Sequence, residues 1–437
     1  MALHSKTTYV FISGKNWKLS LAELVSFLQA RNCVFEVSDV TKAFFTASID
    51  ESFSPSIIAD LGGIIKIGRV ATNISTQTVE EAFLQSSKQA QTQVRMSLSS
   101  SAIEDEMLVS SPRKSVFGVS VYNVERSLFS VSKTMQRFLG NSLKHDLAAH
   151  GKKSGFMGFP RGRREPQLTH VEVLKKDLVE RKAEVLFCVG RRRTSLSTTV
   201  AVHNPFEFQK RDIGRPVQRK IFAIPPRLAR IMVNQTFCTP GKSFLDPFCG
   251  VGTILQEALL AGARVIGVDL NPWCVNAARE NLEWLKRIYG VERAECTVLQ
   301  GDSRRLTKKI QHEIDCIATE PDLGPALRHI PTTSYAIRII EQHKSLYHDF
   351  LEEAYRILKK GGRLALVTPY IKTRSGEPVG MRIEEKAMSV GFRRVYPFQH
   401  CVFGPDIVPH ENLIEMSSFV DMGKRHKIGR EIHVFQK

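Results

Sequence analysis

The sequence predicts an α/β protein whose C-terminal half holds a parallel β-sheet with helices on both faces, preceded by smaller α+β units. Two observations support this prediction. From about residue 215 onward, short β-branched runs alternate with helical stretches of ten or more residues, which is typical of a parallel sheet. The chain has 437 residues, 42% of them apolar and 24% charged, which is enough for two or three globular domains.

The first unit is expected over residues 1–75. Its predicted elements are a strand over 8–13, a helix over 19–30, a hairpin of 33–37 with 43–48, and a closing strand over 64–68. Ser20 is the expected N-cap of the helix. The order strand–helix–strand–strand–helix–strand predicts a small ferredoxin-like α+β unit.

A second α/β unit is expected over residues 76–205. Its Ser-rich stretch, 86–114, is expected to begin as a helix and then form a loop. The elements expected after it are a strand over 115–123, a helix over roughly 127–147, a short helix near 171–181 and strands over 184–189 and from about 195. A linker is expected over 206–223.

The C-terminal domain is expected over residues 224–437. It begins with a helix over 224–235, whose prolines fall in the first turn, where a missing N–H costs nothing. The expected strands are SFLDP, ARVIGVDL, ECTVLQGD, DCIATEP and RLALVTP, and a long helix is expected over about 341–358.

Composition excludes several classes of protein. No apolar run is long enough to span a membrane, and the N-terminal MALHSKTTYVF lacks the apolar block of a signal peptide. We therefore expect an intracellular, cytoplasmic protein with no membrane partner. The eight cysteines form no Cys-x-x-Cys pair and, with the histidines, no zinc-like spacing, so we expect reduced thiols and no metal site.

The net charge of +18 is concentrated in one stretch of the chain. Residues 151–230 contain 19 Lys and Arg and 7 Asp and Glu, so the net charge of this stretch is 19 − 7 = +12. This is two-thirds of the net charge of the whole chain. A phosphate-backbone partner explains this distribution, and a merely soluble basic surface is the alternative. The candidate RNA-binding residues are Arg161, Arg163 and Arg164, which lie in a loop that also contains phenylalanines, and the run Arg191, Arg192 and Arg193. A solvated turn is the alternative for the latter run.

A glycine loop between a strand and a helix predicts a site for a nucleotide-like cofactor. The strand SFLD ends in Asp246, and Gly250-x-Gly252 precedes the next helix, so the backbone can pass close to a ligand. A dinucleotide enzyme would need a third glycine in register, and Asp246 would repel a pyrophosphate while suiting the ammonium of a methionine moiety. S-adenosylmethionine therefore fits better than NAD.

Two further strand-end acids complete the predicted cofactor site. Asp269 lies 23 residues after Asp246, a spacing at which an acid commonly binds ribose hydroxyls, and Asp302 is placed to accept from an adenine amino group. The cofactor-binding candidates are Asp246, Phe248, Gly250, Gly252, Thr253, Asp269, Leu270 and Asp302. An α/β fold with incidental acids is the alternative.

The fourth strand is followed by Glu320-Pro321-Asp322-Leu323-Gly324, which we expect beside the cofactor's methyl group. An exocyclic amine on a base is a poor nucleophile, and two acceptors can orient it and stabilise its developing positive charge. Glu320 supplies a carboxylate and Pro321 a carbonyl, while Asp322 is an auxiliary acid and Leu323 covers a ring face. A purely structural turn is the alternative.

Several of these motifs resemble one family along nearly the whole chain. The chain resembles THUMP-domain tRNA guanine-N2 methyltransferases, in particular those acting on guanosine at position ten of tRNA. The similar stretches are GKNWKLSLAEL, LGGIIKIGR, VAVHNPFEFQKRDIGRP, IPPRLARIMVNQ, LDPFCGVGTILQEAL, GVDLNPWCV and GREIHVF. The loop after the fourth strand departs from the family's Asp-Pro-Pro-Tyr-Gly at Asp322 and Leu323.

The resemblance implies a two-part enzyme. A ferredoxin-like unit and a THUMP-like RNA-binding domain (76–205) would hold tRNA, and a class I (Rossmann-like) S-adenosylmethionine-dependent methyltransferase domain (224–437) would methylate a guanine N2 amine. The base must leave its stack to reach the loop. Two alternatives stay open: a non-catalytic RNA-binding protein that kept the fold, and an enzyme of this fold acting on another RNA position or on DNA. A small activating protein subunit as a further partner also stays open.

Overall fold

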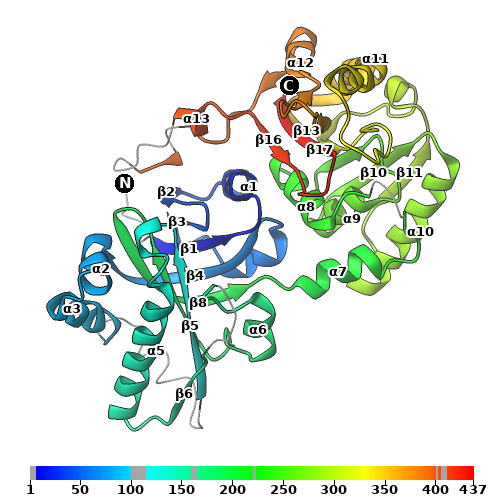
Figure 1. Cartoon of the computed structure of the whole chain (residues 1–437). Coiled ribbons are helices and arrows are strands. Elements are labelled where there is room, and N and C mark those ends of the chain that lie inside the picture. The colour runs from blue at the N-terminus through cyan, green and yellow to red at the C-terminus, as the bar shows by residue number, and fades with distance from the viewer. Residues whose placement is uncertain (1–5, 100–114, 159–164, 220–222, 400–401, 405–410) are drawn as a thin grey trace, which may run out of the picture.

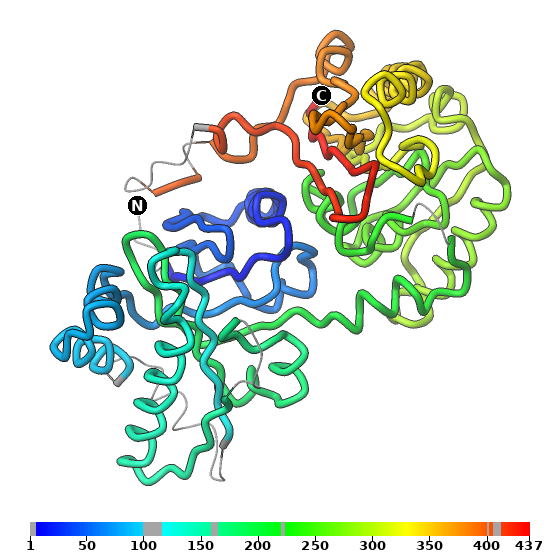
Figure 2. Tube along the Cα trace, in the orientation of Figure 1, coloured from blue at the N-terminus to red at the C-terminus, as the bar shows by residue number. Residues whose placement is uncertain are grey.

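The computed structural model describes residues 6–99, 115–158, 165–219, 223–399, 402–404 and 411–437. Figure 1 shows two bodies side by side, which we name the N-terminal body (residues 6–204) and the C-terminal body (residues 223–437). The joining segment (residues 205–219) runs between them. The tube in Figure 2 shows that a segment of the C-terminal body, near the end of the chain, reaches back towards the N-terminal body and returns.

The N-terminal body is built on one sheet with the strand order β2-β3-β1-β4-β8-β7-β5-β6. Its strands are β1 (Thr7–Ser13), β2 (Phe35–Val40), β3 (Phe44–Ile49), β4 (Ile64–Ser75), β5 (Ser115–Asn123), β6 (Ser154–Phe156), β7 (Glu184–Val189) and β8 (Arg193–Val202). The strands expected in both units therefore form. Because β4 and β8 pair antiparallel along most of their length, the sheet continues across the predicted border between the units.

Helices cover this sheet. They are α1 (Trp17–Ala30), α2 (Thr76–Phe83), α3 (Lys88–Ser99), α5 (Ser132–Ala149) and α6 (His170–Lys175), with 3₁₀ turns η1 (Pro55–Asp60) and η2 (Arg126–Leu128). A 3₁₀ turn thus stands where the first unit was expected to have its second helix. The Ser-rich stretch begins as α3, as predicted, and the loop expected after it falls on residues 100–114, outside the described residues.

The prediction that Ser20 caps α1 is wrong. The cap is Asn16, whose side-chain oxygen accepts a hydrogen bond from the Leu19 backbone N–H. Ser20 lies inside the first turn, and its hydroxyl donates back to the Asn16 carbonyl. Both residue types favour caps, and the helix begins earlier because Asn16 is available upstream of the first buried turn.

The C-terminal sheet has the order β11-β10-β9-β12-β13-β17-β15, with β14 beside β13 and β16 beside β17. The strands are β9 (Ser243–Asp246), β10 (Arg264–Asp269), β11 (Cys296–Gln300), β12 (Ile314–Thr319), β13 (Leu358–Ile371), β14 (Val379–Gly380), β15 (Arg393–Arg394), β16 (Ser418–Asp421) and β17 (Ile428–Gln436). The strands from β11 to β13 run parallel, as predicted. The sheet is nevertheless mixed, because β17 runs antiparallel to β13 and to its hairpin neighbour β16.

Helices flank this sheet as the sequence predicts for a doubly wound fold. They are α8 (Pro226–Gln235), α9 (Thr253–Leu260), α10 (Pro272–Tyr289), α11 (Thr333–Ile357), α12 (Glu384–Val390) and α13 (Glu411–Ile414), with the 3₁₀ turn η3 (Ser303–Lys308). The long helix α11 starts earlier than expected, because the Thr332 hydroxyl accepts from the Tyr335 N–H and caps it there. In the described part of the chain, no helix is both long and apolar enough to cross a membrane.

The joining segment contains a helix that the sequence analysis took for linker. This helix, α7 (Pro205–Ile213), is capped by Asn204, whose side chain accepts from the Phe206 N–H. Arg211 on α7 donates to Glu257 of α9, with an Nε–Oε1 distance of 2.6 Å, and both side chains are buried. The segment is therefore anchored to the C-terminal body by a buried ion pair.

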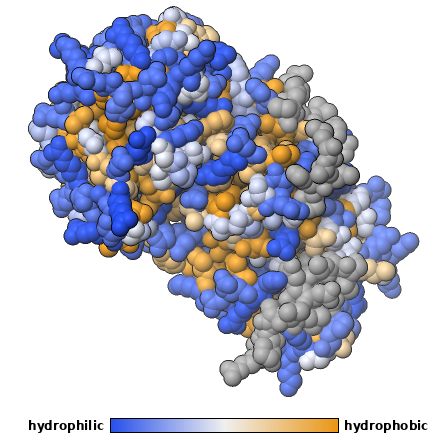
Figure 3. All heavy atoms as spheres, turned by 180° about the vertical axis from the view of Figure 1, so that it is seen from behind, coloured by the Kyte–Doolittle hydropathy of each residue, from blue (hydrophilic) through white to orange (hydrophobic). Residues whose placement is uncertain are grey.

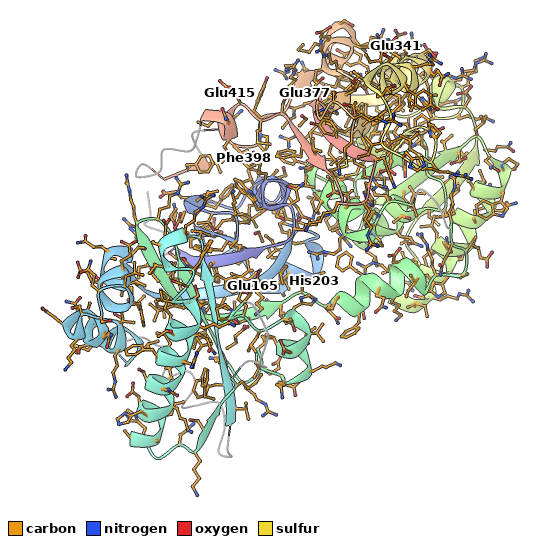
Figure 4. All side chains as sticks on the ribbon, viewed as in Figure 1. Glu165, His203, Glu341, Glu377, Phe398 and Glu415 are labelled. Carbon is orange, nitrogen blue, oxygen red and sulfur yellow. The ribbon has the colours of Figure 1, made fainter. Side chains whose placement is uncertain are left out.

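The two bodies share buried contacts. One hydrophobic cluster contains Leu28 of α1, Met232 of α8 and Leu255 of α9. The same cluster contains Phe398, labelled in Figure 4, which is fully buried and lies edge-on to Phe419 with ring centroids 5.9 Å apart. On the face shown in Figure 3, hydrophilic side chains cover much of both bodies, with hydrophobic ones in patches between them.

A buried carboxylate also joins the bodies. Glu23 of α1 accepts from the backbone N–H groups of Gly62 and Gly63 at 2.8 and 2.7 Å, and from the side-chain amide of Asn234 on α8 at 2.8 Å. Arg227, also on α8, donates to the Gly62 carbonyl. Burial raises the pKa of Glu23 to about 7, although these hydrogen bonds oppose the shift.

Candidate active site

Three parallel strands of the C-terminal sheet end at one edge. β9 ends at Asp246, and its neighbours β10 and β12 end at Asp269 and Thr319. The chain continues to β10 on one side of β9 and later returns to β12 on the other side, so a crevice is expected at this point in an α/β sheet. The Thr319 hydroxyl donates to Asp246 Oδ1 at 2.7 Å, which joins the β9 and β12 ends directly.

Asp246 is almost fully buried, yet it lies among other acids. Its Oδ1 also accepts from the Phe248 backbone N–H at 3.2 Å, and no hydrogen bond to its Oδ2 is found among the described residues. Burial raises the pKa of Asp246 to about 7, and the charges of Asp269 and Glu320 add to the shift. A cationic ligand beside Asp246 would relieve both effects.

The glycine loop between β9 and α9 (residues 247–252) has the backbone that the sequence predicts. Gly250 and Gly252 have φ values of 51° and 86°, a region that favours glycine. The Gly250 N–H donates to Asp269 Oδ2 at 2.9 Å, so the acid at the end of β10 holds the loop after β9. No atom outside its chain neighbours lies within 4 Å of a Cβ placed on Gly250, so this part of the loop is open to a ligand.

The remaining cofactor candidates differ in exposure and in how many hydrogen bonds they already form. Asp269 Oδ1 accepts from the Asn271 N–H, so each of its oxygens already holds one backbone group. Leu270 is 68% exposed beside it. Asp302 caps η3 and forms a bidentate pair with the Arg304 guanidinium, whose hydrogen bonds lower the pKa of Asp302. An adenine amino group would have to share or displace Arg304.

Phe248 and Thr253 bracket the glycine loop. Phe248 is half-buried and packs edge-on against Phe350 of α11, with ring centroids 5.4 Å apart. Thr253 is the first residue of α9 and accepts a hydrogen bond from Arg215 of the joining segment, with an Nη1–Oγ1 distance of 2.6 Å. Arg215 is not among the residues that the sequence predicts for the site.

Glu320, expected to orient the substrate amine, is held by a partner that the sequence analysis also missed. Arg430 of β17 donates to both of its oxygens, at 2.5 Å from Nε to Oε2 and 3.0 Å from Nη2 to Oε1. Burial raises the pKa of Glu320, although Arg430 opposes the shift. Arg430 lies in the stretch GREIHVF, which resembles the family but does not by itself predict a role for this side chain.

The other loop residues are placed differently. Pro321 is buried, whereas the Asp322 side chain is 68% exposed and lies 3.6 Å from His343 Nε2. The Tyr347 hydroxyl donates to the Asp322 carbonyl at 3.0 Å and fixes the loop against α11. Leu323 is half-buried and packs against the main hydrophobic cluster, so only part of it can face a base.

The RNA-binding candidates lie on the other body. Arg191, Arg192 and Arg193 occupy the turn between β7 and β8 and the start of β8, and they line a cleft of about 1280 Å³ together with Trp17 and Phe129. These three arginines lie on a different body from the loop after β12. The three arginines of the glycine-containing loop, Arg161, Arg163 and Arg164, lie outside the described residues.

The sheet edge, the glycine loop and the loop after β12 agree with one known domain. Residues 215–376 match the UPF0020 family model, which is described as an RMKL-like methyltransferase domain. The chain therefore carries a methyltransferase domain, and every cofactor and catalytic candidate falls within the matched residues.

Relatives of known name share this methyltransferase domain. The chain is 36% identical over 160 residues to tRNA (guanine(10)-N2)-dimethyltransferase of Methanothermobacter thermautotrophicus, which covers 36% of this chain and 43% of that protein. It is 35% identical over 164 residues to the protein of the same name from Pyrococcus abyssi, covering 37% and 44%. The matches thus span less than half the length of these relatives. The crystal structure of TrmN from Thermus thermophilus is similar over 98% of this chain and 99% of that one, at 16% identity and a TM-score of 0.49.

Proposed function

We propose that this protein is a tRNA methyltransferase that transfers a methyl group from S-adenosylmethionine to the exocyclic N2 amine of a guanosine, at position ten of tRNA. The observation that carries the proposal is the junction of Asp246, the glycine loop and Glu320 at one edge of a methyltransferase-domain sheet. The names of the relatives, which act on guanine N2 of tRNA, support the choice of substrate.

The residues at the edge fit S-adenosylmethionine, which supplies an activated methyl group when bound. Gly250 leaves open space for a close backbone approach, and Asp246 offers a buried carboxylate to a positively charged group. Each Asp269 oxygen accepts one backbone N–H and keeps a further lone pair. With these lone pairs Asp269 accepts hydrogen bonds from the ribose hydroxyls. These features support the cofactor assignment.

For the substrate, Glu320 and the Pro321 carbonyl accept the two N–H bonds of the guanine amine. Arg430 uses one lone pair on each Glu320 oxygen, which leaves further lone pairs for the amine. The ion pair opposes the effect of burial on the pKa of Glu320 and fixes the direction of its carboxylate, which is thereby placed to stabilise positive charge that develops on the nitrogen. Asp322 remains an auxiliary acid at the exposed side of the loop.

The N-terminal body holds the tRNA in this proposal. We assign residues 1–75 to a ferredoxin-like unit, 76–205 to a THUMP-like RNA-binding domain, 206–223 to the linker and 224–437 to the methyltransferase domain. The order of strands β2-β3-β1-β4 supports the first assignment, and the basic stretch from 151 to 230 supports RNA binding. The cytoplasm is the proposed compartment, and a small activating subunit is a further proposed partner.

A specific observation favours one second candidate, an RNA-binding protein that kept the fold without its chemistry. The Glu320 carboxylate already has a complete charged partner, and the loop has lost the aromatic residue that would stack on an extruded base. Under this reading, the Glu320–Arg430 pair only stabilises the loop.

Mass spectrometry of tRNA nucleosides separates the two candidates. Cells lacking the gene are expected to lose N2-methylguanosine or N2,N2-dimethylguanosine from tRNA, and the wild-type gene is expected to restore it, with any partner subunit supplied by the cell. A Glu320→Gln gene that restores protein level without restoring the nucleoside serves as the matched control. Unchanged nucleosides in the deletion strain, together with tRNA binding by the pure protein, would favour the RNA-binding candidate.

A further inference from the structure

Arg215 is a buried cation that forms no ion pair with any described residue. It lies in the joining segment, only 3% of it is exposed, and no described acid lies within ion-pair distance of it. Its Nε has no hydrogen-bond partner in the described structure. Burial lowers the pKa of Arg215 more than the charge of Asp212 raises it. Because an uncompensated buried charge is costly, this arrangement points to an anion that binds here.

The hydrogen bond that the described structure gives to the Arg215 side chain shows where that anion would lie. Its Nη1 donates to the hydroxyl of Thr253, the first residue of α9. The start of a helix carries unpaired N–H groups and partial positive charge, and the first turn of α9 contains no acid to neutralise it. Guanidinium and helix start together form an anion-binding arrangement at the end of the glycine loop.

The position of Arg215 is fixed relative to this loop. Two residues later, Val217 exchanges hydrogen bonds with Asn281 of α10, from N to Oδ1 and from Nδ2 to O, each at 2.9 Å. The same Asn281 amide donates to the Val251 carbonyl in the glycine loop at 2.9 Å. The joining segment is thus attached to the loop from two sides, and Arg215 is pre-organised before any ligand arrives.

We propose that Arg215 binds the carboxylate of the amino-acid part of S-adenosylmethionine, which rests on the proposed function. Asp246 lies at the strand end of the glycine loop and Thr253, with Arg215, at its helix end. An α-amino acid carries one ammonium and one carboxylate, so an acid and a guanidinium at the two ends of the loop match its two charges. A phosphate of the RNA chain fits less well, because Arg215 is almost fully covered.

Calorimetric titration with two ligands that differ only in this carboxylate tests the proposal. The ligands are S-adenosylmethionine and decarboxylated S-adenosylmethionine, and the proteins are wild type, Arg215→Met and Arg215→Lys. Wild type is expected to bind the carboxylate-bearing ligand about 10- to 100-fold more tightly, the scale of a charge-assisted hydrogen bond. In Arg215→Met that preference should vanish while the affinity for the decarboxylated ligand stays within about twofold. Arg215→Lys should keep part of the preference.

The outcomes distinguish carboxylate binding from the other roles that Arg215 could have. The exposed Arg219 lies in the same segment, and Arg219→Met is the matched control, expected to behave as wild type. If Arg215→Met weakens both ligands equally, the residue only supports the loop and the proposal is overturned. If the preference survives while tRNA affinity falls, the anion is an RNA phosphate, and the proposal is again overturned. If wild type binds neither ligand, the proposed function itself fails. Thermal unfolding of each variant shows whether it is folded.

Discussion

Arg430 and Glu320 form a bidentate ion pair that connects the C-terminal strand β17 to the loop after β12. The two oxygens of Glu320 lie 2.5 and 3.0 Å from the guanidinium nitrogens Nε and Nη2. The side chains are only 9% and 11% exposed, so the pair is screened little by solvent. The loop expected to contact the substrate amine is therefore held by a residue 110 positions away in the sequence.

Glu320→Gln is expected to lower the rate of methyl transfer by roughly 10²–10³, the scale for losing one pre-organised electrostatic group. The substitution keeps the size but removes the charge and turns one acceptor into a donor, which would face the donors of the amine. Asp322→Asn is expected to cost less, because that side chain is largely exposed and is auxiliary. Single-turnover methylation of tRNA, with both binding affinities measured alongside, checks this. An inactive Asp322→Asn beside a fully active Glu320→Gln would show that the other acid is essential.

Arg430→Met is expected to shift the pH dependence of the reaction. Burial already raises the pKa of Glu320, and Arg430 is the group that opposes the shift, so its loss raises this pKa further. Activity near pH 7 should fall below that of wild type and recover as pH is raised and the carboxylate ionises.

Arg430→Lys should show a smaller shift, because it keeps the charge but not the two-point contact. The exposed Arg425, close to the start of β17, gives the control Arg425→Met. A purely structural role for Arg430 would lower the rate equally at every pH, and that result would count against a role through Glu320.

The strand-end acids were accessible to sequence reasoning, whereas their partners were not. Asp246 and Asp269 end two short, mostly apolar runs, and the ends of adjacent parallel strands meet at one edge, so their proximity follows from local pattern alone. Arg430 and Arg215 contact their partners only through tertiary packing. Neither has a local signal, because an arginine in a strand or linker looks the same whether it faces solvent or a buried carboxylate.

In the fold, too, some elements have a local sequence signal and others are set by tertiary packing. The parallel strands were predicted because β-branched runs alternate with helices, but β17 was not placed, since its antiparallel partner β13 is chosen by the fold and not by spacing. The short helix α7 falls in the expected linker, which rests on the resemblance of VAVHNPFEFQKRDIGRP to a domain end and the linker after it. Its stability comes from the buried pair of Arg211 with Glu257, which no local pattern indicates.

The affinity for S-adenosylmethionine is expected to rise with pH. The pKa of Asp246 in the folded protein is about 7, above its ordinary value, so the group is partly protonated below neutrality. A cation binds the ionised form, and the association constant should therefore rise by up to about tenfold per pH unit below 7 and level off above it. Calorimetry between pH 5.5 and 7.5 measures this. Asp246→Asn should bind weakly with a flat profile, and an equally steep profile in that variant would assign the proton to another group.

Binding of tRNA is expected to depend on salt through the arginines at the β7–β8 turn. Neutralising Arg191, Arg192 and Arg193 together should reduce the slope of log affinity against log salt by up to about three units if all three meet phosphates, and nearer two if that RNA is single-stranded. The control replaces three exposed cations of α5: Lys133, Arg137 and Lys144. If the slope changes in the control but not in the turn variant, the RNA crosses α5 instead.

Glu23 is expected to make the stability of the protein fall as pH rises. Its pKa is about 7 in the folded protein against an ordinary 4.5, so the unfolded state binds fewer protons between these values and folding is penalised as pH increases. A shift of this size lowers the free energy of unfolding by about 3 kcal/mol, in full above pH 7. Glu23→Gln removes the titrating group and with it the pH-dependent penalty, at a pH-independent cost because one N–H that Glu23 accepts would face the amide NH2.

Chemical unfolding of wild type and Glu23→Gln at pH 5 and pH 8 tests this, because other titrating groups cancel in the comparison. The difference in unfolding free energy between the two proteins should shift by up to about 3 kcal/mol in favour of Gln at pH 8. Glu23→Ala should be destabilised at both pH values by about 1–3 kcal/mol for each polar group left unpaired at Gly62, Gly63 and Asn234. A pH-independent difference between wild type and Glu23→Gln would show that Glu23 stays ionised, held by its three donors against its burial.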